Sequence, residues 1–303
     1  MEATATAATP GRTGDLLLRW RVALIVLLLG LATVAWMSTD VRMTGMDAGP
    51  GTDPGALGFY VSTWVVMMAA MMFPSIAPMV LMYAALQRGR RAKGQTAPAE
   101  ATGFFVAGYL VIWTVAGLLG YAVLKLGREL NGGALAWDSS GRWVAVGVLF
   151  AAAVYEFTPA KHACLRRCRS PLGFLMGNWR DGRAGALRMG IVHGAWCVGC
   201  CWLLMAALFA LGAMSLAWMI VIAALIAVEK LVPWERAATV GVAAVLVGLG
   251  LGIAASPNDV PALTVPTSEG MSMHHQSEPG GGPMPNDAPK RDGPMNEMND
   301  RMP

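Results

Sequence analysis

The chain has 303 residues and a net charge of only +4. Hydrophobic residues make up 55% of it and charged residues only 14%. Because an ordinary soluble domain carries about 25% charged residues, this composition excludes such a domain and indicates a protein embedded in a lipid bilayer. The basic surplus follows membrane topology, as shown below, so no nucleic-acid partner is expected.

About seven apolar runs are predicted to form membrane helices. In chain order they cover about 20–37, 60–86, 103–126, 142–158, 186–211, 213–229 and 236–255. The fifth and sixth runs are divided near Gly212, where a tight turn costs a glycine least. The first run could be a signal peptide, but it lacks a small-x-small cleavage site, so an anchor is favoured. The predicted fold is an all-α polytopic transmembrane bundle over residues 20–255.

Basic residues gather on alternate connections between these runs. They are Arg88, Arg90, Arg91 and Lys93 after the second run, and Lys161, Arg166, Arg167, Arg169, Arg180, Arg183 and Arg188 after the fourth. The connection after the first run instead carries Asp40, Asp47 and Asp53 against one Arg42. By the positive-inside rule, the N-terminal segment 1–19 is predicted to be cytoplasmic and the C-terminus to lie outside.

The last segment, 256–303, has a different composition. It is rich in Pro, Gly, Asn and Asp and poor in aliphatic residues, which predicts a disordered extracytoplasmic tail. It also contains MSMHH at 271–275, followed by Met284, Met295, Met298 and Met302. These side chains are soft-metal ligands, but the sequence does not show whether the tail binds metal.

The fifth run contains HGAWCVGCC, which places one histidine and three cysteines within nine residues. On a helix, His193, Cys197 and Cys200 fall at about 0°, 40° and −20°, and Cys201 at about 80°. A thiolate in lipid needs a compensating positive charge, and a soft metal ion that binds thiolate and imidazole supplies one. The alternative is that these cysteines are neutral and simply pack.

The second run, STWVVMMAAMMFPSIAPMVLMY, carries a stripe of methionines along one side. On a helix, all six of its methionines fall within an arc of about 140°; they are Met67, Met68, Met71, Met72, Met79 and Met82. Thioethers often just fill gaps, but they also bind Cu(I) in preference to zinc. Pro74 and Pro78 are expected to kink this helix.

The connection after the fourth run contains KHACLRRC, with Cys164 and Cys168 at i, i+4. The neighbouring arginines would favour thiolate, although incidental cysteines remain the alternative. With His162, these cysteines would form a cytoplasmic layer beneath the membrane thiols, an order that suits a Cu(I) path into the cell. Of the two acids near the inner boundary, Glu229 is expected to pair with Lys230. Glu156 is expected to be an interfacial carboxylate, a proton site or a ligand.

With these motifs, the chain resembles the bacterial predicted metal-binding integral membrane proteins over about residues 60–255. The resemblance rests on WVVMMAAMMFPSIAPM, YEFTPAKHACLRRCRSPLGF, HGAWCVGCCWLLM and the EK pair at 229–230. It implies a multi-pass protein of the bacterial inner membrane in which metal binding is suspected. It carries over to Met67, Met68, Met71, Met72, Cys164, Cys168, His193, Cys197, Cys200 and Cys201. Family members often have a basic residue at His162, so that position departs from the pattern.

The leading hypothesis is a non-enzymatic protein that transports Cu(I) or delivers it to a copper chaperone or a copper-receiving membrane protein. Zinc remains possible, because one histidine and three cysteines would make a closed zinc site. A thiol–disulfide oxidoreductase using Cys197 and Cys200 is the enzymatic alternative. The last alternative is a purely structural assembly subunit, in which the sulfur-containing residues only pack. Whether the second and fifth runs are neighbours is left open by the sequence.

Overall fold

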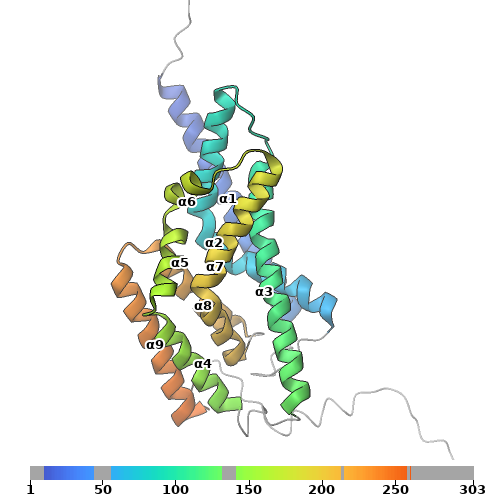
Figure 1. The fold of residues 1–303 in the computed structure, drawn as a ribbon, viewed down its shortest axis with the longest axis vertical. Coiled ribbons are helices and arrows are strands. Elements are labelled where there is room, and N and C mark those ends of the chain that lie inside the picture. The colour runs from blue at the N-terminus through green and yellow to red at the C-terminus, as the bar shows by residue number, and fades with distance from the viewer. Residues whose placement is uncertain (1–9, 44–55, 132–140, 213–214, 258–259, 261–303) are drawn as a thin grey trace, which may run out of the picture. The chain divides into compact units, whose positions relative to one another are not determined.

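The computed structural model describes residues 10–43, 56–131, 141–212, 215–257 and 260, and within these it contains nine helices and no strand. The all-helical prediction is therefore confirmed for this part of the chain (Figure 1). The helices are α1 (Pro10–Met43), α2 (Leu57–Ala92), α3 (Ala101–Asn131), α4 (Arg142–Tyr155), α5 (Pro159–Arg169), α6 (Pro171–Asn178), α7 (Gly182–Gly212), α8 (Leu216–Leu231) and α9 (Glu235–Ala255).

The seven predicted apolar runs fall on α1, α2, α3, α4, α7, α8 and α9. Five of these helices, namely α1, α2, α3, α7 and α9, are long and apolar enough to cross a membrane. A sixth span arises if α4 and α5, which meet at a bend of 68°, are counted as one broken helix. The fold is thus compatible with a multi-pass membrane protein. Seven crossings and the orientation of the termini stay predictions.

Gly212 ends α7 with a φ of 114°. Residues with a side chain rarely adopt this left-handed backbone conformation, whereas glycine adopts it without steric cost. The predicted division of the long apolar stretch near Gly212 is therefore confirmed. The predicted tail, 256–303, lies almost entirely outside the described residues, as do residues 1–9 of the N-terminal segment.

α3 and α7 cross closely because glycines line their interface. Gly190 and Gly194 of α7 have the small-xxx-small spacing that lets membrane helices approach. A Cβ at Gly190 would collide with the backbone carbonyl of Phe105, and one at Gly108 would collide with the carbonyl of Leu187. The close crossing brings the side chain of Tyr109 on α3 onto the cysteine-bearing face of α7.

α2 reaches α7 as well as its neighbours α1 and α3. The ring of Trp64 stacks on Phe209 of α7, with 5.6 Å between the ring centroids, and its Nε1 donates to the carbonyl of Trp113 on α3 at 2.8 Å. The two helices that the sequence could not place together therefore touch. α2 contains Pro74 and Pro78, and its ribbon changes direction along its length, as predicted (Figure 1).

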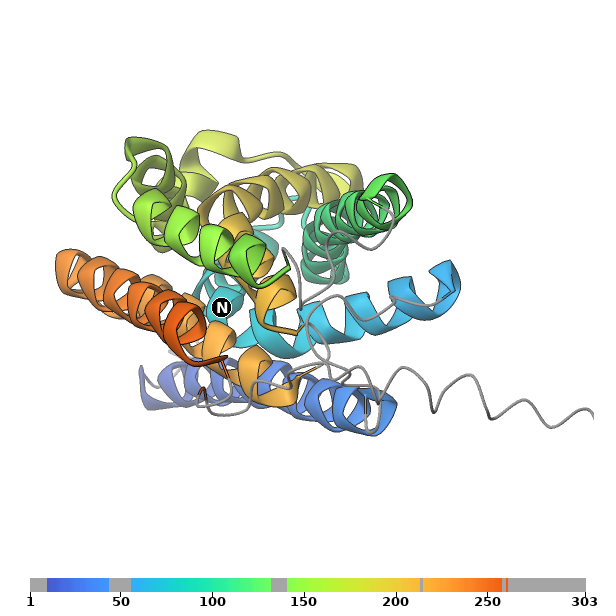
Figure 2. The same cartoon turned by 90° about the horizontal axis from the view of Figure 1, so that it is seen from below.

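The remaining helices pack against α2, α7 and one another. α1 packs on α2, and α4 packs on both α9 and α7, as the view in Figure 2 also shows. The basic connection after α4 forms α5 and α6, and α5 lies against α7 and α8. Thr158 caps α5 by accepting a hydrogen bond from the backbone N–H of Lys161 at 3.3 Å, and Pro159 occupies the first turn, where its missing donor costs nothing.

Candidate metal site

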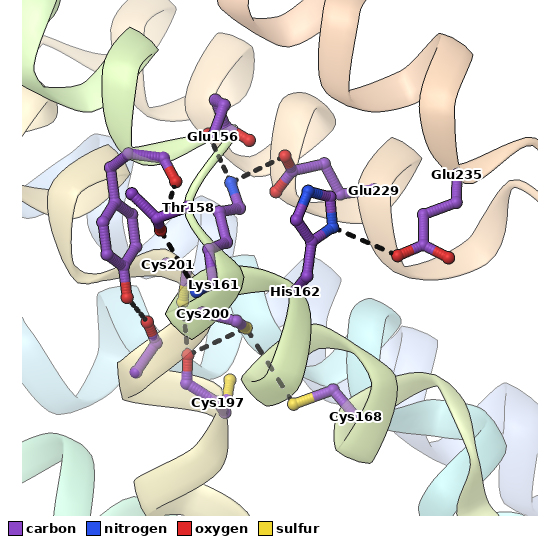
Figure 3. A network of polar contacts seen from close by, with 12 residues as sticks. Glu156, Thr158, Lys161, His162, Cys168, Cys197, Cys200, Cys201, Glu229 and Glu235 are labelled. Carbon is purple, nitrogen blue, oxygen red and sulfur yellow. Dashed lines mark hydrogen bonds and ion pairs between the residues drawn. The ribbon is translucent and has the colours of Figure 1, made fainter.

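Three cysteines form a buried sulfur cluster on α7. The Sγ atoms of Cys197, Cys200 and Cys201 all lie within 4.8 Å of one another (Figure 3). Each side chain is at most 1% exposed. The thiols of Cys200 and Cys201 donate to the carbonyl oxygen of Cys197 at 3.1 and 2.9 Å. The helical spacing that the sequence indicated thus brings all three sulfurs to one place.

The spacing of these sulfurs fits a soft metal ion. A metal–thiolate bond is about 2.3 Å long, so two thiolates on opposite sides of one ion lie about 4.6 Å apart. The three Sγ atoms lie within 4.8 Å of one another, a range that includes this separation. Small rotations about the Cys197, Cys200 or Cys201 side chains would therefore suffice to bind an ion between two of the sulfurs.

α5 adds sulfur to this cluster. The Sγ of Cys168 lies 3.9 Å from the Sγ of Cys200 (Figure 3). Cys164 borders the same segment, since a Cβ at Gly199 would lie 2.8 Å from its sulfur. Both α5 cysteines are half-buried, whereas those of α7 are buried. The sequence predicted the α5 cysteines as a separate cytoplasmic layer, and the structure instead joins Cys168 to the α7 thiols.

The arginines near these α5 cysteines have other partners. Arg169 donates to the carbonyl of Val232, and the guanidinium of Arg167 lies over the ring of Trp196, 5.0 Å from its centroid. Arg167 and Arg169 were expected to stabilise thiolates on α5, but the contacts of their guanidinium groups are with Trp196 and Val232 instead. A different cation contacts the cluster.

That cation is Lys230 of α8. Its Nζ lies 3.0 Å from the Sγ of Cys197 and 3.4 Å from the Oγ of Ser75 on α2. The hydroxyl of Tyr109 lies 3.0 Å from the same sulfur. Cys197 is thus surrounded by an ammonium and a hydroxyl, two donors that favour a thiolate over a thiol. The predicted local ion pair between Glu229 and Lys230 is wrong.

Glu229 instead belongs to a buried triad with Lys161 and Glu156. The Nζ of Lys161 lies 2.7 Å from Oε1 of Glu229 and also contacts Oε1 of Glu156 (Figure 3). All three residues are at most 2% exposed. Glu156 is therefore a buried member of an ion network, and its roles as an interfacial carboxylate, a proton site or a ligand stay predictions. The cause is the bend between α4 and α5, which turns both residues toward α8.

His193 lies one turn before Cys197 and is buried in an aromatic enclosure. Its ring lies 5.1 to 6.0 Å, centroid to centroid, from the rings of Phe105, Tyr109 and Phe174. Among the described residues, its Nδ1 has no hydrogen-bond partner, and the mutually close ligand atoms are those of the three cysteines. Its role as a ligand stays a prediction. His162 forms an ion pair with Glu235, with 3.2 Å between Nδ1 and Oε1.

The methionine stripe is buried and approaches the thiols through Ser75. The four predicted ligands Met67, Met68, Met71 and Met72 are at most 3% exposed. The hydroxyl of Ser75 donates to the carbonyl of Met72 at 2.9 Å and lies 4.0 Å from its sulfur. Because Ser75 also contacts Lys230, Met72 is linked to Cys197 through two intervening residues, Ser75 and Lys230.

The sequence reasoning missed Lys161, Lys230 and Tyr109 as parts of the site. Lys161 was counted among the basic residues of a cytoplasmic connection, and Lys230 was paired with its neighbour in sequence. The sequence did contain a signal for Lys230. This lysine ends an apolar run, and a charge buried in a membrane needs a partner. No local pattern could have named Cys197 as that partner.

The apolar helices and the buried cluster of soft thiol ligands place this chain in the class of helical proteins that bind soft metals. The comparison with known families narrows it: the chain belongs to a family described as a copper chaperone (PpoB2), whose model matches residues 61–253. All five cysteines and the methionine stripe lie within the matched region. No curated protein and no solved structure matches the chain.

Proposed function

We propose that this protein is a membrane-embedded, non-enzymatic copper chaperone that holds Cu(I) on the α7 thiols and delivers it to a copper-receiving protein. The observation that carries the proposal is the cluster of Cys197, Cys200 and Cys201, extended by Cys168 of α5. Membership in a copper chaperone family supports the choice of copper. Localisation in the bacterial inner membrane, with the C-terminus outside, is part of the proposal.

The arrangement of sulfurs supports delivery as well as storage. Copper bound to α7 can exchange one sulfur at a time, because Cys168 lies 3.9 Å from Cys200. Cys168 and Cys164 are half-buried, so this exchange leads from an enclosed site to a more accessible one. Stepwise exchange never leaves the ion without ligands, which keeps the barrier to release low. We therefore infer that copper leaves through α5.

The methionines of α2 support Cu(I) rather than Zn(II) as the metal. Thioethers bind Cu(I) well and zinc poorly, and they carry no charge that would oppose burial in lipid. Met67, Met68, Met71 and Met72 would offer copper neutral ligands on its way to the thiols. Zinc would be held by the cysteines alone.

The decisive experiment compares metal binding by the wild-type protein and a Cys197→Ser/Cys200→Ser variant. Both are purified in detergent, loaded with Cu(I) or with Zn(II), and analysed for metal content. We expect copper to be retained by the wild type and lost by the variant, and more copper than zinc to be retained under competition. The Cys164→Ser variant is the matched comparison and should retain copper, because Cys164 lies outside the α7 sulfur cluster. Absence of copper from the wild type would refute the proposal.

One observation favours a second function, a thiol–disulfide oxidoreductase. Cys197 and Cys200 form a C-x-x-C motif, and Cys168 approaches Cys200 as a resolving thiol would. The same samples distinguish the two functions. An oxidoreductase would bind no copper, and Cys197 and Cys200 would interconvert between dithiol and disulfide in a glutathione redox buffer.

A further inference from the structure

Among the residues that the structure describes, no carboxylate pairs with the buried ammonium of Lys230. Lys230 is 9% exposed, and its Nζ contacts the sulfur of Cys197 and the hydroxyl of Ser75. The nearest acid in sequence, Glu229, is already paired with Lys161. Among the described residues, the groups that can balance this charge are the thiols of the α7 cluster, and Cys197 is the one in direct contact with the ammonium.

Apart from the cysteines, the groups that the described residues place near Lys230 and Cys197 are neutral or already paired. α2 contributes Ser75 and the thioether of Met72. α3 contributes the hydroxyl of Tyr109, which contacts Cys197. On α8, the acid Glu229 is held by Lys161, which also contacts Glu156. The protein thus places one fixed positive charge against a cluster of thiols in a buried environment.

The ammonium of Lys230 can balance the negative charge of a copper–thiolate unit. One Cu(I) ion bound by two thiolates carries a net charge of −1, and a third thiolate would make it −2. A buried net charge without a partner is very costly, whereas a compensated one is tolerated. A single ammonium beside Cys197 offsets the charge of a dithiolate, but not that of a trithiolate.

We propose that Lys230 is the fixed counter-cation of a Cu(I)–dithiolate centre and thereby sets both its charge and its preference for a monovalent metal. Cys197 is one thiolate, and either Cys200 or Cys201 supplies the second, while the remaining cysteine stays a neutral thiol. Lys230 is a positioning residue, since it binds sulfur and not the ion. The inference rests on the proposed copper function and adds the means by which the site selects its cargo.

Divalent zinc bound by the same two thiolates does not need the charge of Lys230. Zn(II) with two thiolates is neutral, so the ammonium leaves an uncompensated positive charge beside it. Loss of Lys230 should therefore weaken Cu(I) binding strongly and affect Zn(II) binding much less. A purely structural role of Lys230 would weaken both metals alike, and this difference provides the test.

The experiment measures the affinities of the full-length protein in detergent for Cu(I) and Zn(II), using competing chelators. Lys230→Met removes the charge and keeps the apolar stem, whereas Lys230→Arg keeps the charge. We expect Lys230→Met to lower the Cu(I) affinity at least about 100-fold, as breaking a buried charge pair does. The ratio of Cu(I) to Zn(II) affinity should fall at least about tenfold, and Lys230→Arg should preserve that ratio.

The outcomes separate this inference from the proposed function. If wild-type protein binds no copper, the copper function itself fails. If the wild type binds copper and Lys230→Met leaves the ratio of affinities unchanged, the role of Lys230 is refuted while the copper function stands. Circular dichroism and size-exclusion profiles establish that each variant is folded. Lys230→Gln serves as a second neutral variant if Lys230→Met does not fold, and it carries the same expectation.

Discussion

The two buried lysines of this protein have opposite kinds of partner. Lys161 lies between the carboxylates of Glu156 and Glu229, whereas Lys230 contacts a thiol sulfur and a hydroxyl. Carboxylates hold the first ammonium with hard, charged oxygens, and the result is a closed ion network. The sulfur that holds the second is also a soft-metal ligand. The comparison shows that one residue type serves to join helices in the first region and to prepare a binding site in the second.

The largest effect is expected from Lys161→Met, which leaves two buried carboxylates without their cation. Removing one partner of a buried ion network costs about 3–5 kcal/mol, so the thermal unfolding temperature should fall strongly. The triple variant Lys161→Met/Glu156→Gln/Glu229→Gln removes the charges together and should recover most of this loss. Copper bound per folded molecule should equal that of the wild type. A loss of copper from folded protein would show that the triad belongs to the metal site.

Gly190→Ala is expected to have the next largest effect. Its Cβ would collide with the backbone carbonyl of Phe105, so α3 must move away from α7, at a cost of about 1–3 kcal/mol of overpacking. The shift would also separate Tyr109 from Cys197 and lower the Cu(I) affinity. Gly241→Ala is the control, since a Cβ there meets nothing within 4 Å. Thermal unfolding of both variants checks this prediction, and equal unfolding temperatures would contradict it.

Tyr109→Phe removes the hydroxyl next to Cys197 and leaves the ring in place. A hydrogen bond of this kind contributes about 0.5–1.5 kcal/mol, so the Cu(I) affinity should fall up to about tenfold. Tyr155→Phe is a matched control, because the Tyr155 hydroxyl donates to the backbone carbonyl of Gly199 at 2.7 Å and not to a sulfur. Titration of both variants against a Cu(I) chelator provides the measurement. Equal losses in the two variants would mean that Tyr109 acts through packing alone.

The sequence predicted what depends on local spacing. Apolar runs located the helices, Gly212 located the break, and the i, i+3, i+4 pattern of Cys197, Cys200 and Cys201 located the sulfur cluster. The positions of Lys161 and Lys230 depend instead on long-range packing of α5 and α8 onto α7. The positive-inside rule treats every lysine of a connection as solvated, and it therefore misplaced the one lysine that the bend between α4 and α5 buries.

A smaller effect is expected from Met72→Leu, which replaces a thioether with an apolar side chain of similar volume. Such a replacement usually costs less than about 1.5 kcal/mol of stability. The thiol cluster is unchanged, so bound copper at saturation should remain the same while the rate of copper loading falls. The loading rate should fall by less than about tenfold, which is the largest fall in Cu(I) affinity expected for Tyr109→Phe. Met82→Leu, on an exposed position of α2, is the control and should load at the wild-type rate.

The smallest effect is expected from His162→Ala. The imidazole of His162 pairs with Glu235, and both side chains are about one-third exposed, at 33% and 38%. Partly exposed pairs of this kind contribute about 0–1 kcal/mol, so the unfolding temperature should hardly change. Copper content and affinity should also stay at the wild-type level if α5 contributes sulfur alone. A clear fall in copper binding by folded protein would instead show that the imidazole takes part in moving copper along α5.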